Sequence, residues 1–311
     1  MSGKLATWAV ALLFLLGGCV RMPDTGVTTL KTETPDKLER QLLDVRADVE
    51  QFRPRGPFKF NVQEDHELLI SPTERIEADV YLSVHPGPAP LVVFLHGSGR
   101  SKEDHAYQAV HLATWGMHSI SVQLPGEGPW IRNGRTLARI VSFIRRRPEA
   151  VDRRIDPNKI VLVGYSFGGA AVAIALAEGA VAAGAVLLDP AGIGKALPTY
   201  LRKVRKPVMI IASDPKVNVM RQRGDFYRYI SSDVAQISIR GAHHDDAMFP
   251  LESGLFETSN ANEAHQITFV AALTATVFGL ASTGKLDYAW GSFGEALKRG
   301  KMVDARRKPP K

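Results

Sequence analysis

The sequence predicts an α/β fold in which a mostly parallel central sheet carries helices on both faces. The first observation is a set of short, continuous apolar runs without polar alternation, a pattern typical of strands that are buried on both faces. These runs occupy residues 91–95, 161–163, 184–188 and 208–212. The second observation is that segments with helical spacing separate the runs. Strands that alternate with helices favour parallel pairing beneath helical layers.

The other elements fit the same plan. Two strand segments precede the apolar runs, at 58–63 and 66–84. The second segment contains a turn at 71–73. Helical spacing is seen in six segments: near 36–51, and at 103–115, 135–147, 168–178, 220–231 and 263–279. A last strand is expected to begin at 236 and to end in a glycine turn. We expect residues 57–282 to form one α/β domain.

The N-terminal residues resemble an export signal. Lys4 precedes an apolar segment at 5–16, which is shorter than the roughly 20 residues that span a bilayer. The segment ends in Leu-Gly-Gly before Cys19, the one cysteine of the chain, and this ending resembles a bacterial lipobox. The resemblance implies that residues 1–18 are a lipoprotein signal peptide and that the thiol of Cys19 carries a lipid. Val20, where aspartate would favour inner-membrane retention, implies an outer-membrane address.

Charge is distributed unevenly along the chain. The formal net charge is +7, and residues 298–311 hold seven Lys or Arg against one Asp. We expect 19–56 to be a tether and 283–311 to be a basic, flexible tail. The sequence lacks interleaved aromatic and basic residues and metal-finger spacing, so nucleic acid is not an expected partner.

A serine lies where a buried strand passes into a helix. Residues 160–171 read IVLVGYSFGGAA, so Ser166 stands between Gly164 and Gly168. Small neighbours are needed at a sharp strand-to-helix turn, and this is the Gly-x-Ser-x-Gly pattern of a nucleophile elbow. The turn raises the serine hydroxyl above the carboxyl edge of the sheet, where ligands of parallel sheets bind.

Hydrolysis of an acyl group also needs donors for the developing oxyanion. Residues 94–99 read FLHGSG and follow an apolar strand. Residues 96–99 resemble the His-Gly turn of α/β-hydrolases, and the resemblance implies that the backbone N–H of Ser98 is one donor. The N–H of Phe167, just past the serine, is the other expected donor. His96 is expected to be structural. Segment 125–133 could line the pocket with Trp130 and Ile131, and segments 190–206 and 214–232 could form a small cap.

The expected general base follows the last strand. The stretch 236–246 reads QISIRGAHHDD, and His244, third after Gly241, fits the role better than His243. Adjacent side chains diverge, so this stretch does not predict a metal site. His265 lies in an expected helix. For the acid, the residues leave two strand-end carboxylates open, Asp189 after GAVLL and Asp214 after VMIIAS.

The motifs resemble the α/β-hydrolase superfamily. The blocks GYSFGGAAV, GAVLLDP and ISIRGAHH look like its platelet-activating-factor acetylhydrolase branch, and LVVFLHGSG resembles the oxyanion turn of that branch. This resemblance favours Asp189 as the acid. The cutinase-like (also dienelactone hydrolase-like) branches share the elbow and the Gly-Ala-x-His turn, but their acid falls on Lys216.

Together these features predict a serine hydrolase that cleaves carboxylic esters without metal or cofactor. Ser166 attacks, His244 takes the proton, and Asp189, with Asp214 as the alternative, orients the imidazole. The expected substrates are small or lipid-borne acyl esters, and the expected membrane contact is the lipid on Cys19. Two alternatives stay open: a non-catalytic envelope lipoprotein that uses the same fold for binding, and a serine peptidase or acyltransferase with the same triad.

Overall fold

The structure is a computed structural model and describes residues 48–251 and 261–310. The expected signal peptide 1–18, the expected lipidation site Cys19 and most of the tether 19–56 lie outside the described residues. The helix expected near 36–51 lies mostly outside them as well. Of these N-terminal ranges the structure describes a short 3-10 helix, η1 (Val49–Phe52), whose valine and phenylalanine are buried.

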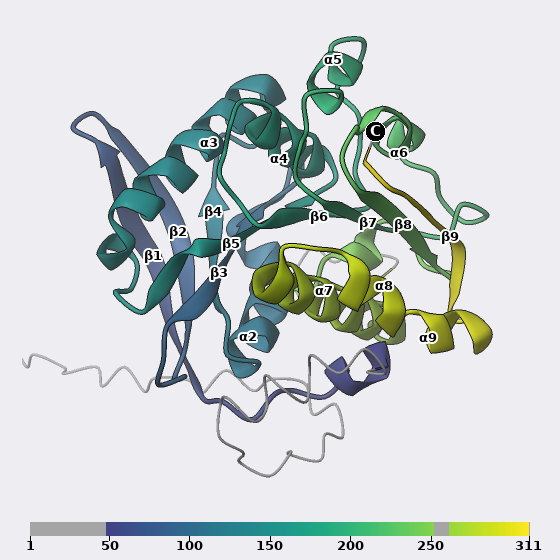
Figure 1. Ribbon diagram of the computed structural model, residues 1–311. Coiled ribbons are helices and arrows are strands. Elements are labelled where there is room, and N and C mark those ends of the chain that lie inside the picture. Colours follow the sequence, from purple (N-terminus) through teal and green to yellow (C-terminus); the bar gives the residue numbers. More distant parts are fainter. Residues whose placement is uncertain (1–47, 252–260, 311) are drawn as a thin grey trace, which may run out of the picture.

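The described residues form a nine-stranded sheet, with the order β1-β2-β4-β3-β5-β6-β7-β8-β9 (Figure 1). The strands are β1 (Phe60–Ser71), β2 (Glu74–Ser83), β3 (Ala89–Leu95), β4 (His118–Gln123), β5 (Ile155–Tyr165), β6 (Gly184–Leu188), β7 (Val208–Ala212), β8 (Val234–Ile239) and β9 (Met302–Lys308). The six strands from β4 to β8 in this order are parallel. Antiparallel strands flank them on both sides. The expected mostly parallel sheet is confirmed.

Helices cover both faces of this sheet, as Figure 1 shows. One face carries α3 (Trp130–Arg146), α4 (Phe167–Ala177), α5 (Leu197–Leu201) and α6 (Arg223–Tyr229). The other carries α2 (Ala106–Thr114), α7 (Glu263–Thr283) and α8 (Asp287–Ser292). Alternate residues of β3 belong to two separate cores: Val92 lies in the core that contains residues of α2 and α7, and Val93 lies in the core that contains residues of α3 and α4. Strands buried in this way need apolar side chains at every position, which explains the continuous runs.

The carboxyl ends of the parallel strands meet at one edge. Tyr165 at the end of β5 is in register with Leu188 at the end of β6, and Leu188 is in register with Ile211 in β7. The residues that follow these strands are therefore brought side by side although they are far apart in the sequence. This edge is where parallel sheets place their ligands.

Some boundaries differ from the expected ones. Helix α3 begins at Trp130, so Trp130 and Ile131 are helical residues and not part of a loop. The indole of Trp130 stacks on the ring of Phe167 with ring centres 5.7 Å apart. The expected turn near 71–73 is the Pro72-Thr73 turn of a β1–β2 hairpin. The break expected between 63 and 66 is only a register shift within the single strand β1.

The expectation of a flexible tail at 283–311 is wrong. This segment forms α8, α9 (Gly294–Lys298) and β9, which pairs antiparallel with β8 at the edge of the sheet. The guanidinium of Arg307 donates to both carboxylate oxygens of Asp233, at 2.9 and 2.7 Å. Phe293 and Met302 are buried in the core. An edge strand needs few apolar residues, and Arg307 has a charged partner in Asp233, just before β8, so a basic composition is compatible with order.

Candidate active site

Ser166 occupies the turn between β5 and α4 with backbone angles φ 54° and ψ −124°. Such angles are rarely adopted by residues other than glycine, so the surrounding structure has to hold the turn. The Ser166 N–H donates to the Leu188 carbonyl at 3.0 Å. The Ser166 carbonyl accepts from Gly169 at 3.0 Å and from Ala191 at 2.9 Å. These bonds occupy both backbone polar groups of the residue, which is buried at the sheet edge with 5% of its surface exposed.

Glycines allow the chain to pass closely around this turn. A Cβ atom on Gly164 would lie 2.4 Å from the carbonyl oxygen of Gly168, and one on Gly168 would lie 2.3 Å from the carbonyl oxygen of His96. A Cβ on Gly97 would lie 2.9 Å from the Cβ of Ser166. The turn after β3 therefore packs directly against the elbow.

This turn presents an unpaired backbone donor. The Nδ1 of His96 contacts the Gly97 carbonyl at 2.8 Å, and its Nε2 accepts from the Leu124 N–H at 3.2 Å. His96 is wholly buried and braces the turn, as expected. The Ser98 hydroxyl donates to Glu127 at 3.1 Å. Within the described residues, the N–H groups of Ser98 and Phe167 have no intramolecular acceptor, so both could donate to a bound oxyanion.

The structure brings His244 to Asp189, with 2.7 Å between Nδ1 and Oδ2. Asp189 follows β6, is fully buried and has a positive φ of 37°. The imidazole of His244 stacks on the ring of Tyr165, the residue before Ser166, with centres 4.7 Å apart. The carboxylate, the imidazole and the serine turn are thus gathered at the ends of β5 and β6. A contact through Nδ1 leaves Nε2 as the nitrogen available to act as a base.

Asp214 has a different environment. One of its carboxylate oxygens accepts from the Lys216 N–H at 2.9 Å, and the other accepts from the Gly241 N–H at 2.8 Å. These backbone donors hold the pKa of Asp214 below its ordinary value, although its burial acts in the opposite direction. The carboxylate joins the loop after β7 to the glycine turn after β8. It does not contact His244, so of the two candidate acids the structure pairs only Asp189 with the imidazole.

Sequence patterns do not single out two residues that complete the surroundings of Asp189. The guanidinium of Arg223, on α6, donates to Asp189 Oδ1 at 2.7 Å. Ser213 donates its N–H to Oδ1 at 3.1 Å and its hydroxyl to Oδ2 at 2.9 Å. Burial opposes ionisation, but the hydrogen bond and charge of His244 and the charge of Arg223 outweigh it and lower the pKa of Asp189. An arginine on a short amphipathic helix gives no sequence signal of this contact.

The loop that carries His244 is fastened by a second buried carboxylate. Asp246 accepts the N–H of His243 at 2.7 Å and contacts Nδ1 of His265 at 3.0 Å. His243 and His265 therefore have structural contacts around the loop and do not meet Asp189. Within residues 48–251 and 261–310, no group of three or more His, Cys, Asp or Glu residues could hold a metal ion.

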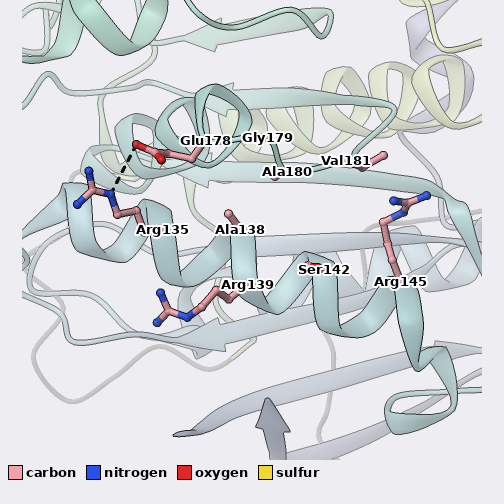
Figure 2. A pocket seen from close by; sticks show the side chains of 9 residues that line it. All are labelled: Arg135, Ala138, Arg139, Ser142, Arg145, Glu178, Gly179, Ala180 and Val181. Carbon is pink, nitrogen blue, oxygen red and sulfur yellow. Dashed lines mark ion pairs between the residues drawn. The ribbon is translucent and has the colours of Figure 1, made fainter. Parts of the chain in front are cut away.

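Two further features lie away from this site. A groove of about 370 Å³ runs between α3 and the residues after α4, and Figure 2 shows arginines along it. Two of these arginines are already paired, Arg135 with Glu178 and Arg139 with Glu74. Among the described helices, only α7 is long and apolar enough to cross a membrane, but 89% of its apolar window is buried inside the protein, as in a core helix.

The sequence was compared with known proteins. The profile described as the alpha/beta hydrolase family matches residues 92–294, which is more than half of the chain and includes Ser166, Asp189 and His244. A comparison with curated proteins gave no match.

Proposed function

Because this chain belongs to the alpha/beta hydrolase family, we propose that it is a serine hydrolase that cleaves carboxylic esters through Ser166, His244 and Asp189. The observation that carries the proposal is the 2.7 Å contact between His244 and a buried Asp189, beside a serine on a strained strand-to-helix turn. A carboxylate so placed fixes the imidazole tautomer and stabilises its cation. Membership of the family supports hydrolysis, and our proposal adds the ester substrate and the three catalytic residues.

The reaction would proceed through an acyl-enzyme. His244 Nε2 takes the proton of the Ser166 hydroxyl while Oγ bonds to the carbonyl carbon, and the carbonyl electrons move onto oxygen. The N–H groups of Ser98 and Phe167 stabilise this oxyanion, and each such donor contributes about 3 kcal/mol of barrier lowering. When the intermediate collapses, the C–O bond to the alcohol breaks, and the alcohol leaves with the proton from His244. Water then repeats the sequence on the acyl-enzyme and releases the acid.

The expected substrates are small or lipid-borne acyl esters. The described residues contain two short helices, α5 and α6, in the region expected to form a cap, and the aromatic Phe226 of α6 is buried in the core. Two short helices make only a small cap, which supports substrates of this class. The similarity of the motifs to the platelet-activating-factor acetylhydrolase branch supports the same class of substrates.

Hydrolysis of nitrophenyl esters of short and long acyl chains tests this function. Purified protein should release nitrophenol and the free acid, and Ser166→Ala and His244→Gln should abolish both. Equal release by the wild type and Ser166→Ala would refute the assignment. Transfer of the acyl group to an alcohol or amine in place of water would instead favour an acyltransferase, and Ser166-dependent cleavage of a peptide amide would favour a peptidase. Binding without turnover would favour a scaffold protein.

We further propose that the chain is anchored to the cell envelope by a lipid on Cys19, on the outer-membrane side. Support comes from the apolar segment 5–16 and the lipobox-like residues that end in the one cysteine of the sequence. Metabolic labelling with a radioactive fatty acid should mark the wild-type protein and leave Cys19→Ser unlabelled. Equal labelling of both would refute the anchor without affecting the hydrolytic proposal.

A further inference from the structure

The acid of the proposed triad is paired with two partners that differ in kind. His244 contacts Asp189 Oδ2 at 2.7 Å and becomes charged only when it accepts a proton. Arg223 contacts Oδ1 at 2.7 Å, and a guanidinium is a permanent cation in proteins. Arg223 is 3% exposed and Asp189 is 0% exposed. A permanent cation is therefore buried on the side of the carboxylate that faces away from the imidazole.

Arg223 is held in place by more than its charge. Its Nη1 also donates to the Ser213 hydroxyl at 2.8 Å and to the Ser213 carbonyl at 3.2 Å. The neighbouring residue Gln222 accepts the N–H of Gly194 at 2.8 Å, which ties the start of α6 to the loop that follows Asp189. These contacts fix where the guanidinium lies, and through it the rotamer of the carboxylate.

We propose that Arg223 is a positioning residue for the hydrolytic reaction, which orients the Asp189 carboxylate and offsets part of its negative charge, so that His244 stays an unprotonated base at lower pH. The inference rests on the proposed function. A carboxylate paired only with histidine stabilises the imidazolium with its whole charge, which favours protonation of the imidazole. A second, permanent cation on the same carboxylate reduces that stabilisation.

Other charged and titratable groups near the imidazole do not have this effect. Tyr165 stacks on His244, and its hydroxyl lies 3.4 Å from Asp245. Asp245 is itself paired with Arg100 at 3.0 Å, so the negative charge of Asp245 already has a cationic partner. Substitution of Arg223 leaves that pair unchanged. The experiment therefore isolates the cation on the Asp189 side.

The test is the pH dependence of kcat/KM for a nitrophenyl ester, together with the rate at which a fluorophosphonate labels Ser166. Arg223→Gln and Arg223→Met remove the charge, and Asp189 keeps the donors on Ser213 and His244, so both variants should fold. We expect the acid limb of both profiles to move up by about one pH unit. Arg223→Lys, which retains a charge, should keep the limb within roughly 0.3 unit of the wild type. Arg228→Gln, an equal change of charge at an exposed position of α6, should not move it.

Distinct results would overturn the inference and the function. Acid limbs that coincide in the wild type, Arg223→Gln and Arg223→Met would overturn the inference while Ser166-dependent hydrolysis stands. Failure of both charge-removing variants to fold, shown by circular dichroism, would also overturn it and assign Arg223 a purely structural role. A wild-type protein that does not react at Ser166 would overturn the proposed function, and the inference with it.

Discussion

Replacement of Asp189 by asparagine would remove one charge and almost no volume, and its effect can be worked out from the four donors around the carboxylate. Oδ1 accepts from Arg223 and from the Ser213 N–H, and Oδ2 accepts from the Ser213 hydroxyl and from His244 Nδ1. An asparagine must place its NH₂ group on one of these two sides. On the Oδ1 side it would face two donors, one of them a cation.

The loss of the hydrogen bonds from these two donors makes that orientation too costly in free energy. A buried hydrogen bond to a charged group contributes about 1.5–3 kcal/mol, and an unpaired donor is costly in addition. In Asp189→Asn the new NH₂ group must therefore point toward His244 and donate to its Nδ1. The imidazole then carries its proton on Nε2 and cannot accept the proton of Ser166. Arg223 enforces this inactive tautomer, so we expect kcat to fall by about 10⁴-fold, or about 5 kcal/mol of activation free energy.

The assay is steady-state hydrolysis of a nitrophenyl ester with burst titration of the active serine. Asp214→Asn is the matched control, since it makes the same chemical change at the other candidate acid. Its amide oxygen can keep one of the two backbone donors, on Lys216 or Gly241, so we expect about 1 kcal/mol of lost stability and a change in kcat within about five-fold. The reasoning would be refuted if Asp189→Asn stayed within ten-fold of the wild type, or if Asp214→Asn were the inactive variant.

Three further predictions concern the same framework. Gly97→Ala should lower kcat/KM by at least ten-fold with little change in expression, because its Cβ would lie 2.9 Å from the Cβ of Ser166; wild-type rates would contradict the close packing of the turn. Burial lowers the pKa values of three histidines from 6.5, to about 4 for His105, about 3 for His111 and about 4 for His118. The unfolded chain therefore binds protons that the folded protein does not, so the free energy of unfolding in urea should fall between pH 6.5 and pH 4, by up to about 1.4 kcal/mol per pH unit for each histidine, and a flat profile would argue against their burial. Deletion of residues 302–311 should lower the melting temperature and promote aggregation, because it uncovers the edge of β8. An unchanged melting temperature would show that β9 does not contribute to stability.

Much of the fold could be predicted because buried strand positions require apolar residues, and these can be seen directly in the sequence. Strands such as β6 and β7 are apolar at each position, since helices cover both of their faces. The elbow can be recognised for a related reason: a Cβ atom on Gly168 would lie only 2.3 Å from a backbone carbonyl oxygen, so the close packing of the turn requires glycine there. The place of Ser166 follows from both patterns.

The choice between two acids could not be made from the residues alone, because both follow parallel strands at the same edge. What separates them is the direction of their side chains after the strand ends. Asp189 has a positive φ and meets His244, whereas Asp214 turns back to accept backbone N–H groups. Such differences depend on the conformation of loops distant in sequence. The resemblance to a known branch of hydrolases favoured the carboxylate that the structure pairs with the imidazole.

Two other features have weak local signals. Arg223 comes from a short helix whose sequence gives no sign that one arginine is buried against a carboxylate 34 residues away. The C-terminal segment has the composition of a solvated tail, yet Arg307 pairs with Asp233 and Met302 packs into the core. Composition records the number of charges but not whether the folded chain provides partners for them.

The most direct test of the account is to find where a fluorophosphonate binds covalently. We expect intact-mass and peptide mapping to show one adduct per molecule on Ser166 at neutral pH. The adduct should be lost in Ser166→Ala and form far more slowly in His244→Gln. An adduct on another residue, or none in a protein shown to be folded, would contradict the claim that His244 activates this serine.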